Sequence, residues 1–477
     1  MNTTLYHEKI RNLRNEGTFD DKLLSAFTQW MIKAEDWDLF RINPVKLAAS
    51  LELPEPSMID FFVHGSRVGL FDFSWSMICP SCGEIQNNDH SLNALEGEFH
   101  CVVCQAPVQV NIDDTVEVTF TLNPAIRSLN LDPFKDAGTY RAAFFSAAVD
   151  RSPAILEYMN TIWVGFEAIP PQETLIIDRT WKRGKSYRFV SAGVHSQFVF
   201  HVDPEASDVQ EIYPVDFGEN GMSPEELTIK STNGQFRIQN RRYDTVGLMM
   251  VEADFPKLHA LMKSHPGKML PMLTGNQLLS NQKFRELFKM QNLSPALRLN
   301  IRSLTLLFTD LKGSTELYDR TGDVDAYNLI QEHFKLLEKI VSRHGGAVIK
   351  TMGDAVMASF SRPSDGVNAA IDMLRENMEM TQGQKPLGLK IGLHEGPALA
   401  INNRGALDYF GQTVNIAARV QGLAGENTLW MTESVLRSRG VANNLKENKY
   451  VGKRYQASLK GVGERTTVFE LKQKEHL

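Results

Sequence analysis

The sequence predicts a multidomain chain with an α+β domain in its C-terminal third and a β-rich region in the middle. The 477 residues are too many for one hydrophobic core and suggest about three domains. Strand-like and helix-like segments alternate after Ser303, whereas strand-like runs dominate between Val108 and Glu252. The predicted units are a helical N-terminal module (1–78), a cysteine-bearing ribbon (79–107), a β-rich domain (108–254), a helical connector (255–300) and the α+β domain (301–474).

Composition and charge narrow the classes of function. Hydrophobic residues make up 42% of the chain and charged residues 23%, as in an average globular protein. The formal net charge of −6 offers no large basic field to nucleic acid or to an anionic membrane. No apolar run approaches the ~20 residues that span a bilayer, and the N-terminus lacks the apolar core of a signal peptide. We therefore expect a cytoplasmic protein without a membrane segment.

The N-terminal module is predicted from apolar residues at helical spacing between Asp20 and about Leu70. Pro44, Pro54 and Pro56 interrupt the pattern. Short helices followed by the extended FDFSW segment would suit a winged-helix-like unit. A DNA reader needs a basic face, however, and the local charge is balanced. The favoured interpretation is therefore a helical packing or interaction module.

All four cysteines lie in one short segment, as two Cys-x₂-Cys pairs with eighteen residues between them. This spacing is typical of the two knuckles of a tetrahedral zinc site. Closed four-cysteine sites are structural, so Zn²⁺ would stand in for a missing hydrophobic core. Free structural cysteines and a redox switch are the alternatives. The predicted zinc ligands are Cys79, Cys82, Cys101 and Cys104.

The β-rich region is predicted from β-branched and aromatic runs such as SYRFVSAG and SQFVFHV, separated by turn-forming residues. A sandwich-like fold is expected, with a short helical stretch around Arg141 to Tyr158. Such a domain binds a small ligand or merely holds its neighbours, and none of its residues has the spacing of a catalytic group. The connector that follows is helical, with Phe284, Leu287 and Phe288 on one face.

The C-terminal domain places two carboxylates at the ends of predicted strands. The strand LTLLFTD is apolar until Asp310, and LKGST is expected to begin the next helix. AVIKTM and AVMASF flank Gly353-Asp354, a two-residue turn signal that puts Asp354 at a hairpin tip. Strand-end carboxylates beside a helix N-terminus suit a metal and a phosphate. Taken alone, each aspartate is more often a turn or cap residue.

Four segments then carry a family resemblance: FTDLKGST, IKTMGDAVMASF, DYFGQTVNIAAR and SLKGVGERTTVFEL. In this order and spacing they resemble the signature segments of class III adenylate and guanylate cyclases, over about Ser303 to Leu471. The order of strand-like and helix-like segments predicts an α+β domain whose helices cover one side of a mixed sheet, and the resemblance implies a ferredoxin-like fold for it. The upstream CPxC…CxxC ribbon, β-rich region and QKFRELF segment also resemble the N-terminal part of a group of bacterial cyclases.

The resemblance implies a reaction in which the ribose 3′-hydroxyl of a nucleotide attacks its own α-phosphate and expels pyrophosphate. Asp310 and Asp354 would hold two Mg²⁺ or Mn²⁺ ions. Asn415 and Arg419, four residues apart on a helix, would orient the ribose and stabilise charge on the α-phosphate. Lys460 would grip the terminal phosphates. Taken alone, Asn415 is more often a capping or buried polar residue, and Arg419 and Lys460 are more often solvated charges.

Base selection is expected to depend on Lys350 and Asp408. Adenine presents an acceptor at N1 and a donor amine at N6, which a lysine and a carboxylate complement. Adenylate cyclases of this class use this pairing, whereas guanylate cyclases typically place Glu and a small residue there. The sequence thus favours ATP as substrate and cyclic AMP as product. GTP or a pyrimidine nucleotide is the alternative.

The family resemblance also implies an assembly. Its metal carboxylates come from one subunit and its transition-state residues from the other, so a chain with both sets should work as a head-to-tail homodimer. Residues 282–300 would link a regulatory N-terminal region to that interface, with an unidentified small molecule or protein as regulator. Two other classes stay open: a zinc-containing sensor whose degenerate cyclase domain only dimerises, and a nucleic-acid-binding regulator.

Overall fold

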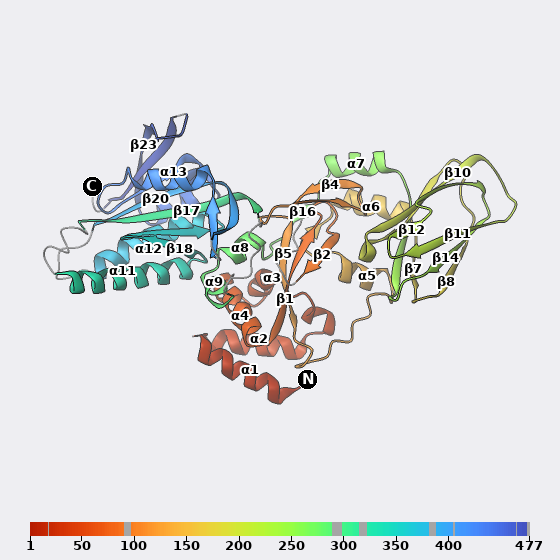
Figure 1. The fold of residues 1–477 in the computed structure, drawn as a ribbon, viewed down its shortest axis with the longest axis horizontal. Coiled ribbons are helices and arrows are strands. Elements are labelled where there is room, and N and C mark those ends of the chain that lie inside the picture. Colours follow the sequence, from red (N-terminus) through yellow and green to blue (C-terminus); the bar gives the residue numbers. More distant parts are fainter. Residues whose placement is uncertain are drawn as a thin grey trace.

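The computed structural model describes residues 1–17, 19–89, 97–288, 298–313, 322–380, 388–403, 406–463 and 465–474. The helix expected to begin at LKGST and part of the expected connector lie outside these ranges. The molecule is elongated, with the C-terminal domain at one end, the N-terminal helices in the middle and the β-rich domain at the other end (Figure 1). Within the described ranges, no helix is long and apolar enough to cross a membrane.

The N-terminal module packs short helices around an aromatic core. Phe27 and Phe61 have ring centroids 4.7 Å apart, and Phe62 and Phe71 have centroids 4.5 Å apart. All four rings are fully buried. Its helices are α1 (Thr3–Glu16), α2 (Asp21–Lys33), η1 (Asp36–Leu39), α3 (Pro44–Ser50) and α4 (Glu55–Arg67). Our sequence analysis did not predict α1, which buries little besides Tyr6 and Leu13.

A small antiparallel sheet follows α4 and carries the ribbon. Its strand order is β2-β1-β5, and the cysteine hairpin β3-β4 lies beside it. The bounds are β1 (Phe71–Ile78), β2 (Ile85–Asp89), β3 (Glu98–Cys101), β4 (Ala106–Gln109) and β5 (Val116–Leu122). The sequence analysis assigned β5 to the β-rich domain, but it pairs with β1. Phe120 explains this, because its ring lies against Phe62 with centroids 4.9 Å apart.

The β-rich domain is built from two sheets that share an aromatic core, as the sequence predicted. The orders are β13-β10-β9-β15-β7 and β12-β11-β14-β8, and the rings of Phe189, Phe200, Phe236 and Trp181 are buried among them. Its strands are β7 (Trp163–Ile169), β8 (Thr174–Asp178), β9 (Ser186–Ser191), β10 (Ser196–Ser207), β11 (Glu211–Gly218), β12 (Gly221–Ser223), β13 (Glu226–Ser231), β14 (Gly234–Asn240) and β15 (Val246–Glu252).

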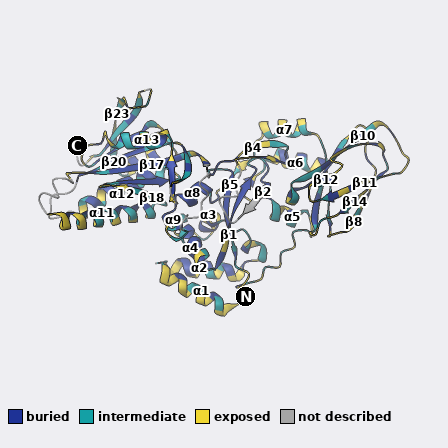
Figure 2. Ribbon diagram, viewed as in Figure 1, coloured by how far each residue is buried: buried dark blue, intermediate teal, exposed yellow. Residues whose placement is uncertain are grey.

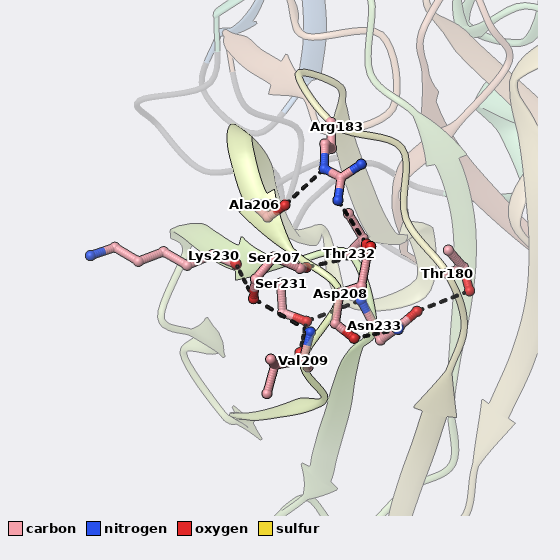
Figure 3. Close-up of polar contacts among 10 residues, drawn as sticks. All are labelled: Thr180, Arg183, Ala206, Ser207, Asp208, Val209, Lys230, Ser231, Thr232 and Asn233. Carbon is pink, nitrogen blue, oxygen red and sulfur yellow. Dashed lines mark hydrogen bonds and ion pairs between the residues drawn. The ribbon is translucent and has the colours of Figure 1, made fainter.

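A polar cluster at the far end of this domain ties two turns together (Figure 3). The carboxylate of Asp208 accepts hydrogen bonds from Arg183 at 2.8 Å and from Thr232 at 2.6 Å. Asn233 donates to the carbonyl of Asp208 at 2.7 Å. The hydrogen bond from Thr232, together with the charge of Arg183, lowers the pKa of Asp208. These polar groups partner one another, so the cluster acts as a structural tie.

Short helices connect the β-rich domain to the ribbon and to the C-terminal domain. On one side lie α5 (Ala137–Phe144), β6 (Val149–Asp150) and α6 (Pro153–Ile162), and η3 (Ala192–Val194) follows β9. On the other lie α7 (Phe255–Ser264), β16 (Lys268–Met269), α8 (Gly275–Leu279) and α9 (Gln282–Leu287).

The C-terminal domain is a mixed sheet of eight described strands. The order is β18-β19-β17-β20-β22-β24-β23, and β21 pairs with β20. The strands are β17 (Arg298–Lys312), β18 (Ala347–Met352), β19 (Ala355–Phe360), β20 (Gly388–Asn403), β21 (Ala406–Phe410), β22 (Thr428–Thr432), β23 (Tyr450–Ala457) and β24 (Thr466–Gln473). The helices are α11 (Asp323–Arg343), α12 (Pro363–Met380), α13 (Gln412–Gln421), α14 (Glu433–Arg437) and α15 (Val441–Glu447).

The two faces of this sheet have different neighbours. Leu307 and Leu311 of β17 pack with α11 and α12, whereas Leu306 and Phe308 belong to the core that contains Ala417 of α13. Because side chains alternate along a strand, α13 lies on the face opposite α11 and α12. The expectation that helices cover one side of the sheet is therefore wrong for α13. The sheet is buried at its centre (Figure 2).

Candidate functional site

Asp310 and Asp354 lie at the same end of neighbouring strands. Phe308 of β17 is opposite Met357 of β19. If this antiparallel register continues, Asp310 faces the start of β19, next to Asp354. Thr309 accepts a hydrogen bond from the Val356 amide at 3.2 Å, which fixes this end of the strand pair. Asp354 follows the hairpin glycine Gly353, whose φ of +65° suits the turn.

Asp310 points to the face of the sheet that carries α13. It shares the strand parity of Leu306 and Phe308, whose neighbours include Ala417 of that helix. Its carboxylate is partly exposed and forms an ion pair with Lys390 of β20, with 3.0 Å between Nζ and Oδ2. The sequence analysis did not single out Lys390. Lys390 lies directly opposite Asp310 in the pairing of β17 with β20. Only the register of the two strands brings these residues together.

Lys350 and Asp408 are brought together, although 57 residues separate them in the sequence. Lys350 Nζ lies 2.7 Å from Asp408 Oδ2. Burial would raise the pKa of Asp408, but hydrogen bonds from Lys350, from the Asn403 amide and from the Tyr409 backbone lower it overall. Asp408 is therefore held as a carboxylate beside the lysine. Asn403 Nδ2 donates to Asp408 Oδ2 at 3.1 Å, and the sequence analysis did not predict this contact.

Asn415 and Arg419 lie on α13, one turn apart. Asn415 is exposed and Arg419 is half-buried. Val420, the residue after Arg419, packs with Leu459, the residue before Lys460. A Cβ atom placed on Gly461 would lie 3.8 Å from Arg419 Nη2, so the guanidinium adjoins the loop that carries the exposed Lys460. Among the described residues, no hydrogen bond or ion pair joins these three to Asp310 or Asp354.

The connector helix α9 contacts both strands that carry the lysine and aspartate pair. Gln282 Oε1 accepts from the Val348 amide of β18 at 2.8 Å, and Arg285 Nη2 donates to the Leu407 carbonyl of β21 at 2.6 Å. Val348 lies two residues before Lys350, and Leu407 immediately precedes Asp408. At the start of α9, Asn281 donates to Asp60 of α4 at 2.7 Å. The helix thus bridges the N-terminal module and the strands that carry Lys350 and Asp408.

The four cysteines converge as the ribbon prediction requires. Their sulfur atoms all lie within 4.8 Å of one another, and all four residues are buried. Cys79 Sγ lies 3.6 Å from Cys104 Sγ, and Cys82 Sγ lies 3.5 Å from Cys101 Sγ. Tetrahedral zinc with Zn–S bonds of ~2.3 Å places its sulfurs ~3.8 Å apart, so the cluster fits this ion. None of the four is in a disulfide.

Two family models match this chain. Residues 299–472 match the adenylate and guanylate cyclase catalytic domain, so the C-terminal domain is a class III nucleotidyl cyclase domain, as the four motifs indicated. Residues 7–286 match a family described as "Family of unknown function (DUF5939)". That match covers more than half of the 477 residues, and the chain therefore belongs to this family.

Relatives of known activity are similar to the C-terminal part. An adenylate cyclase of Anabaena cylindrica is 25% identical over 189 residues, which cover 36% of this chain and 37% of that protein. Adenylate cyclase 2 of Rhizobium meliloti is 28% identical, over 36% of this chain and 50% of its own length. Guanylate cyclase 2G of Rattus norvegicus is 27% identical, over 42% of this chain and 18% of its own length. The chain thus spans between 18% and 50% of the length of these relatives.

Solved structures are also similar over the same part. The adenylyl cyclase CyaB from P. aeruginosa has 19% identity and a TM-score of 0.33, covering 37% of this chain and 97% of that one. The guanylyl cyclase Cya2 has 20% identity and a TM-score of 0.32, covering 38% of this chain and 95% of that one.

Proposed function

We propose that this protein is an adenylate cyclase that converts ATP to 3′,5′-cyclic AMP and pyrophosphate. The observation that supports this best is the 2.7 Å pair of Lys350 and Asp408. A lysine donor and a carboxylate acceptor match N1 and N6 of adenine, whereas guanine presents the reverse pattern. A mismatched base would leave buried polar groups unpaired, at about 1–3 kcal/mol each.

Asp310 and Asp354 are the proposed ligands of two Mg²⁺ or Mn²⁺ ions. The fit is supported by their neighbouring strand ends and by the ammonium group of Lys390 beside Asp310, which marks a position that accepts a cation. The bound ions would make the 3′-hydroxyl more acidic and neutralise the leaving pyrophosphate. The protein itself must then orient the nucleotide and stabilise charge on the α-phosphate.

Those tasks fall to Asn415, Arg419 and Lys460. On α13, Asn415 would position the ribose, while Arg419 stabilises the charge that grows on the α-phosphate. Lys460, on the loop beside Arg419, would hold the terminal phosphates. In the cyclase family that the motifs resemble, the two sets of residues come from different subunits. We therefore propose a homodimer in which each site takes the aspartates of one protomer and α13 of its partner.

The nucleotide proposal is tested by comparing the four nucleoside triphosphates with Mn²⁺ and detecting cyclic products by mass spectrometry. The wild type should prefer ATP. Lys350→Glu combined with Asp408→Ser should move the preference toward GTP by at least tenfold in kcat/KM. A wild type that prefers GTP would refute the ATP assignment. Absence of any cyclic product would favour the alternative in which the cyclase domain has lost its activity and serves only for dimerisation.

For the ribbon we propose a structural Zn²⁺ held by Cys79, Cys82, Cys101 and Cys104. The sulfur spacing supports this ion, and a closed site of four thiolates leaves no open position for catalysis. Elemental analysis should find one zinc per chain in the wild type and none in a Cys79→Ser/Cys104→Ser variant. Wild-type protein that lacks zinc but keeps its fold would contradict the proposal.

We also propose that the N-terminal region regulates the cyclase domain through α9. The contacts of Gln282 and Arg285 with the strands of the base-selecting pair support this route. The start of β17 adds a second contact, because the Ile112 amide donates to the Asn300 carbonyl at 3.1 Å.

A further inference from the structure

A cavity of about 290 Å³ lies where the ribbon meets the β-rich domain. Its walls come from the ribbon knuckle at Val103, from α5 and α6, from β7, β9 and β15, and from the start of α7. Small-molecule sites in proteins usually begin near ~300 Å³ and prefer such junctions between structural units. None of its residues belongs to the proposed nucleotide site.

The lining of this cavity is mostly apolar. It includes Phe145, Trp163, Met249, Val251, Phe255 and Leu258. Trp163 is 40% exposed, which is high for a tryptophan that neighbours a cavity. A water-sized group occupies about 30 Å³, so the cavity can hold a ligand with on the order of ten non-hydrogen atoms.

Three arginines also line the cavity, and no carboxylate among the described residues forms an ion pair with any of them. Arg188 is only 3% exposed and its Nε has no partner. Arg151 is also largely enclosed, whereas Arg141 is exposed and no hydrogen bond is described for its side chain.

The guanidinium groups of the inner arginines are fixed by the ribbon and by aromatic rings. Arg188 donates to the carbonyls of Val102 and Val103, and its centre lies 4.9 Å from the Phe255 ring. Arg151 donates to the Cys82 carbonyl at 2.5 Å, and its centre lies 5.4 Å from the Phe145 ring.

The two carboxylates in the lining are already engaged. Glu252 pairs with Lys185 at 2.8 Å, and Asp254 caps α7 through the Lys257 amide at 3.1 Å. The cavity therefore combines apolar walls with three guanidinium groups, of which Arg151 and Arg188 also lie close to the ribbon cysteines and Arg141 does not have a described partner. A guanidinium recognises an oxyanion such as a carboxylate, because its planar donors match two oxygens. The apolar walls favour a singly charged carboxylate over the more highly charged phosphate.

We propose that this cavity binds a small amphipathic monocarboxylate, with the apolar body against the aromatic walls and the carboxylate toward Arg141 and Arg188. A ligand there would touch Val103, between the second pair of ribbon cysteines. It would thus lie next to the zinc knuckle. The proposal does not depend on the nucleotide specificity of the cyclase domain.

The test compares octanoate, octanol and octylammonium as ligands of the full-length, zinc-loaded protein by isothermal titration calorimetry. Octanoate should bind with one site per chain and at least tenfold more tightly than octanol, and octylammonium should not bind. Arg141→Gln should weaken octanoate binding about tenfold and leave octanol binding unchanged. Arg237→Gln is the matched control, because Arg237 is an exposed arginine on β14 that does not line the cavity.

A cavity-filling variant, Leu258→Trp, should abolish binding of both octanoate and octanol. Arg141 is exposed, so its replacement should not change the thermal unfolding midpoint, which is measured alongside. Equal affinity for octanoate and octanol would overturn the proposal. So would octanoate binding that survives Leu258→Trp, or that is unaffected by Arg141→Gln. The last result would mean that the arginines serve only to balance the charge of the zinc thiolates.

Discussion

The ammonium group of Lys390 contacts the carboxylate that is proposed to bind a divalent cation. The Nζ to Oδ2 distance of 3.0 Å makes Lys390 a direct competitor of that ion for Asp310. Both side chains are partly exposed, so the pair is screened by solvent and its contribution is small. Removing the ammonium group of Lys390 nevertheless changes the charge at the position where the metal is proposed to bind.

We therefore predict that Lys390→Met lowers the Mn²⁺ concentration for half-maximal activity by about two- to fivefold. Metal titrations of cyclase activity at saturating nucleotide measure this. Lys312→Met is the control, since Lys312 lies on the same strand as Asp310 but pairs with Glu426 at 3.3 Å. An unchanged or higher metal requirement would mean that Lys390 orients Asp310.

Asp60 provides a pH-dependent contact between α4 and α9. Burial raises its pKa to about 6, against the opposing hydrogen bond from Asn281 and the charge of Lys283, and nearby Glu286 raises it further. Because the folded pKa lies above the ordinary value of 3.8, the folded state holds the proton more tightly. The protonated Asp60 side chain therefore contributes to the free energy of unfolding at low pH, and this contribution is lost as the pH rises through about 6.

Replacing Asp60 with Asn keeps an acceptor for Asn281 and removes the charge. The variant should be more stable than the wild type at pH 8, and the gain should exceed that at pH 4 by about 2 kcal/mol. Chemical unfolding, followed by a probe in the N-terminal module, measures the difference. A gain that is the same at both pH values would show that the charge of Asp60 is not the cause.

At the scale of elements, α9 is the short helix on which regulation should depend. Gln282 and Arg285 hold β18 and β21 next to Lys350 and Asp408, whereas no described side-chain contact of these two residues reaches Asp310. Gln282 also donates to Glu338 of α11 at 2.8 Å, so its side chain joins two elements of the domain.

We predict that Gln282→Ala combined with Arg285→Ala raises the KM for ATP about tenfold and weakens discrimination against GTP. The metal concentration for half-maximal activity should not change. Lys283→Ala is the matched control on the same helix, because the described ion pair of Lys283 is with Glu286 of α9 itself and no described hydrogen bond joins Lys283 to β18 or β21. If the control variant raised KM equally, or if only kcat fell, α9 would not position Lys350 and Asp408.

The strands and helices of the cyclase domain are predictable because local patterns determine them. The hairpin around Gly353 became β18 and β19 at the expected residues, and LTLLFTD lies within β17. The strand β17 is longer than predicted, because it begins at Arg298, inside the connector that was expected to be helical, and continues to Lys312. The face chosen by α13 and the pairing of β5 with β1 were not predictable, because both follow from contacts between distant segments. The same holds within the site. Lys350 and Asp408 could be predicted because they lie in recognisable sequence motifs. Lys390 and Asn403 could not, because only the strand pairing brings them next to Asp310 and Asp408.

At the scale of the whole molecule, the N-terminal module and the cyclase domain share one continuous core. Phe27 of the module, Phe284 of α9 and Leu306 of β17 belong to the same buried cluster. A shift of the N-terminal helices would therefore also move the sheet face that carries Asp310 and α13. In a dimer with shared sites, such a shift changes how the aspartates of one protomer meet the arginine of its partner.

The most direct test of this account is the activity of defined heterodimers, purified with two different tags. A dimer of one Asp310→Ala chain and one Arg419→Ala chain should keep one intact site and show about half of the wild-type activity. A dimer of one wild-type chain and one chain with both substitutions should show almost none. Half activity in the second dimer and none in the first would place each site within a single chain and contradict the account.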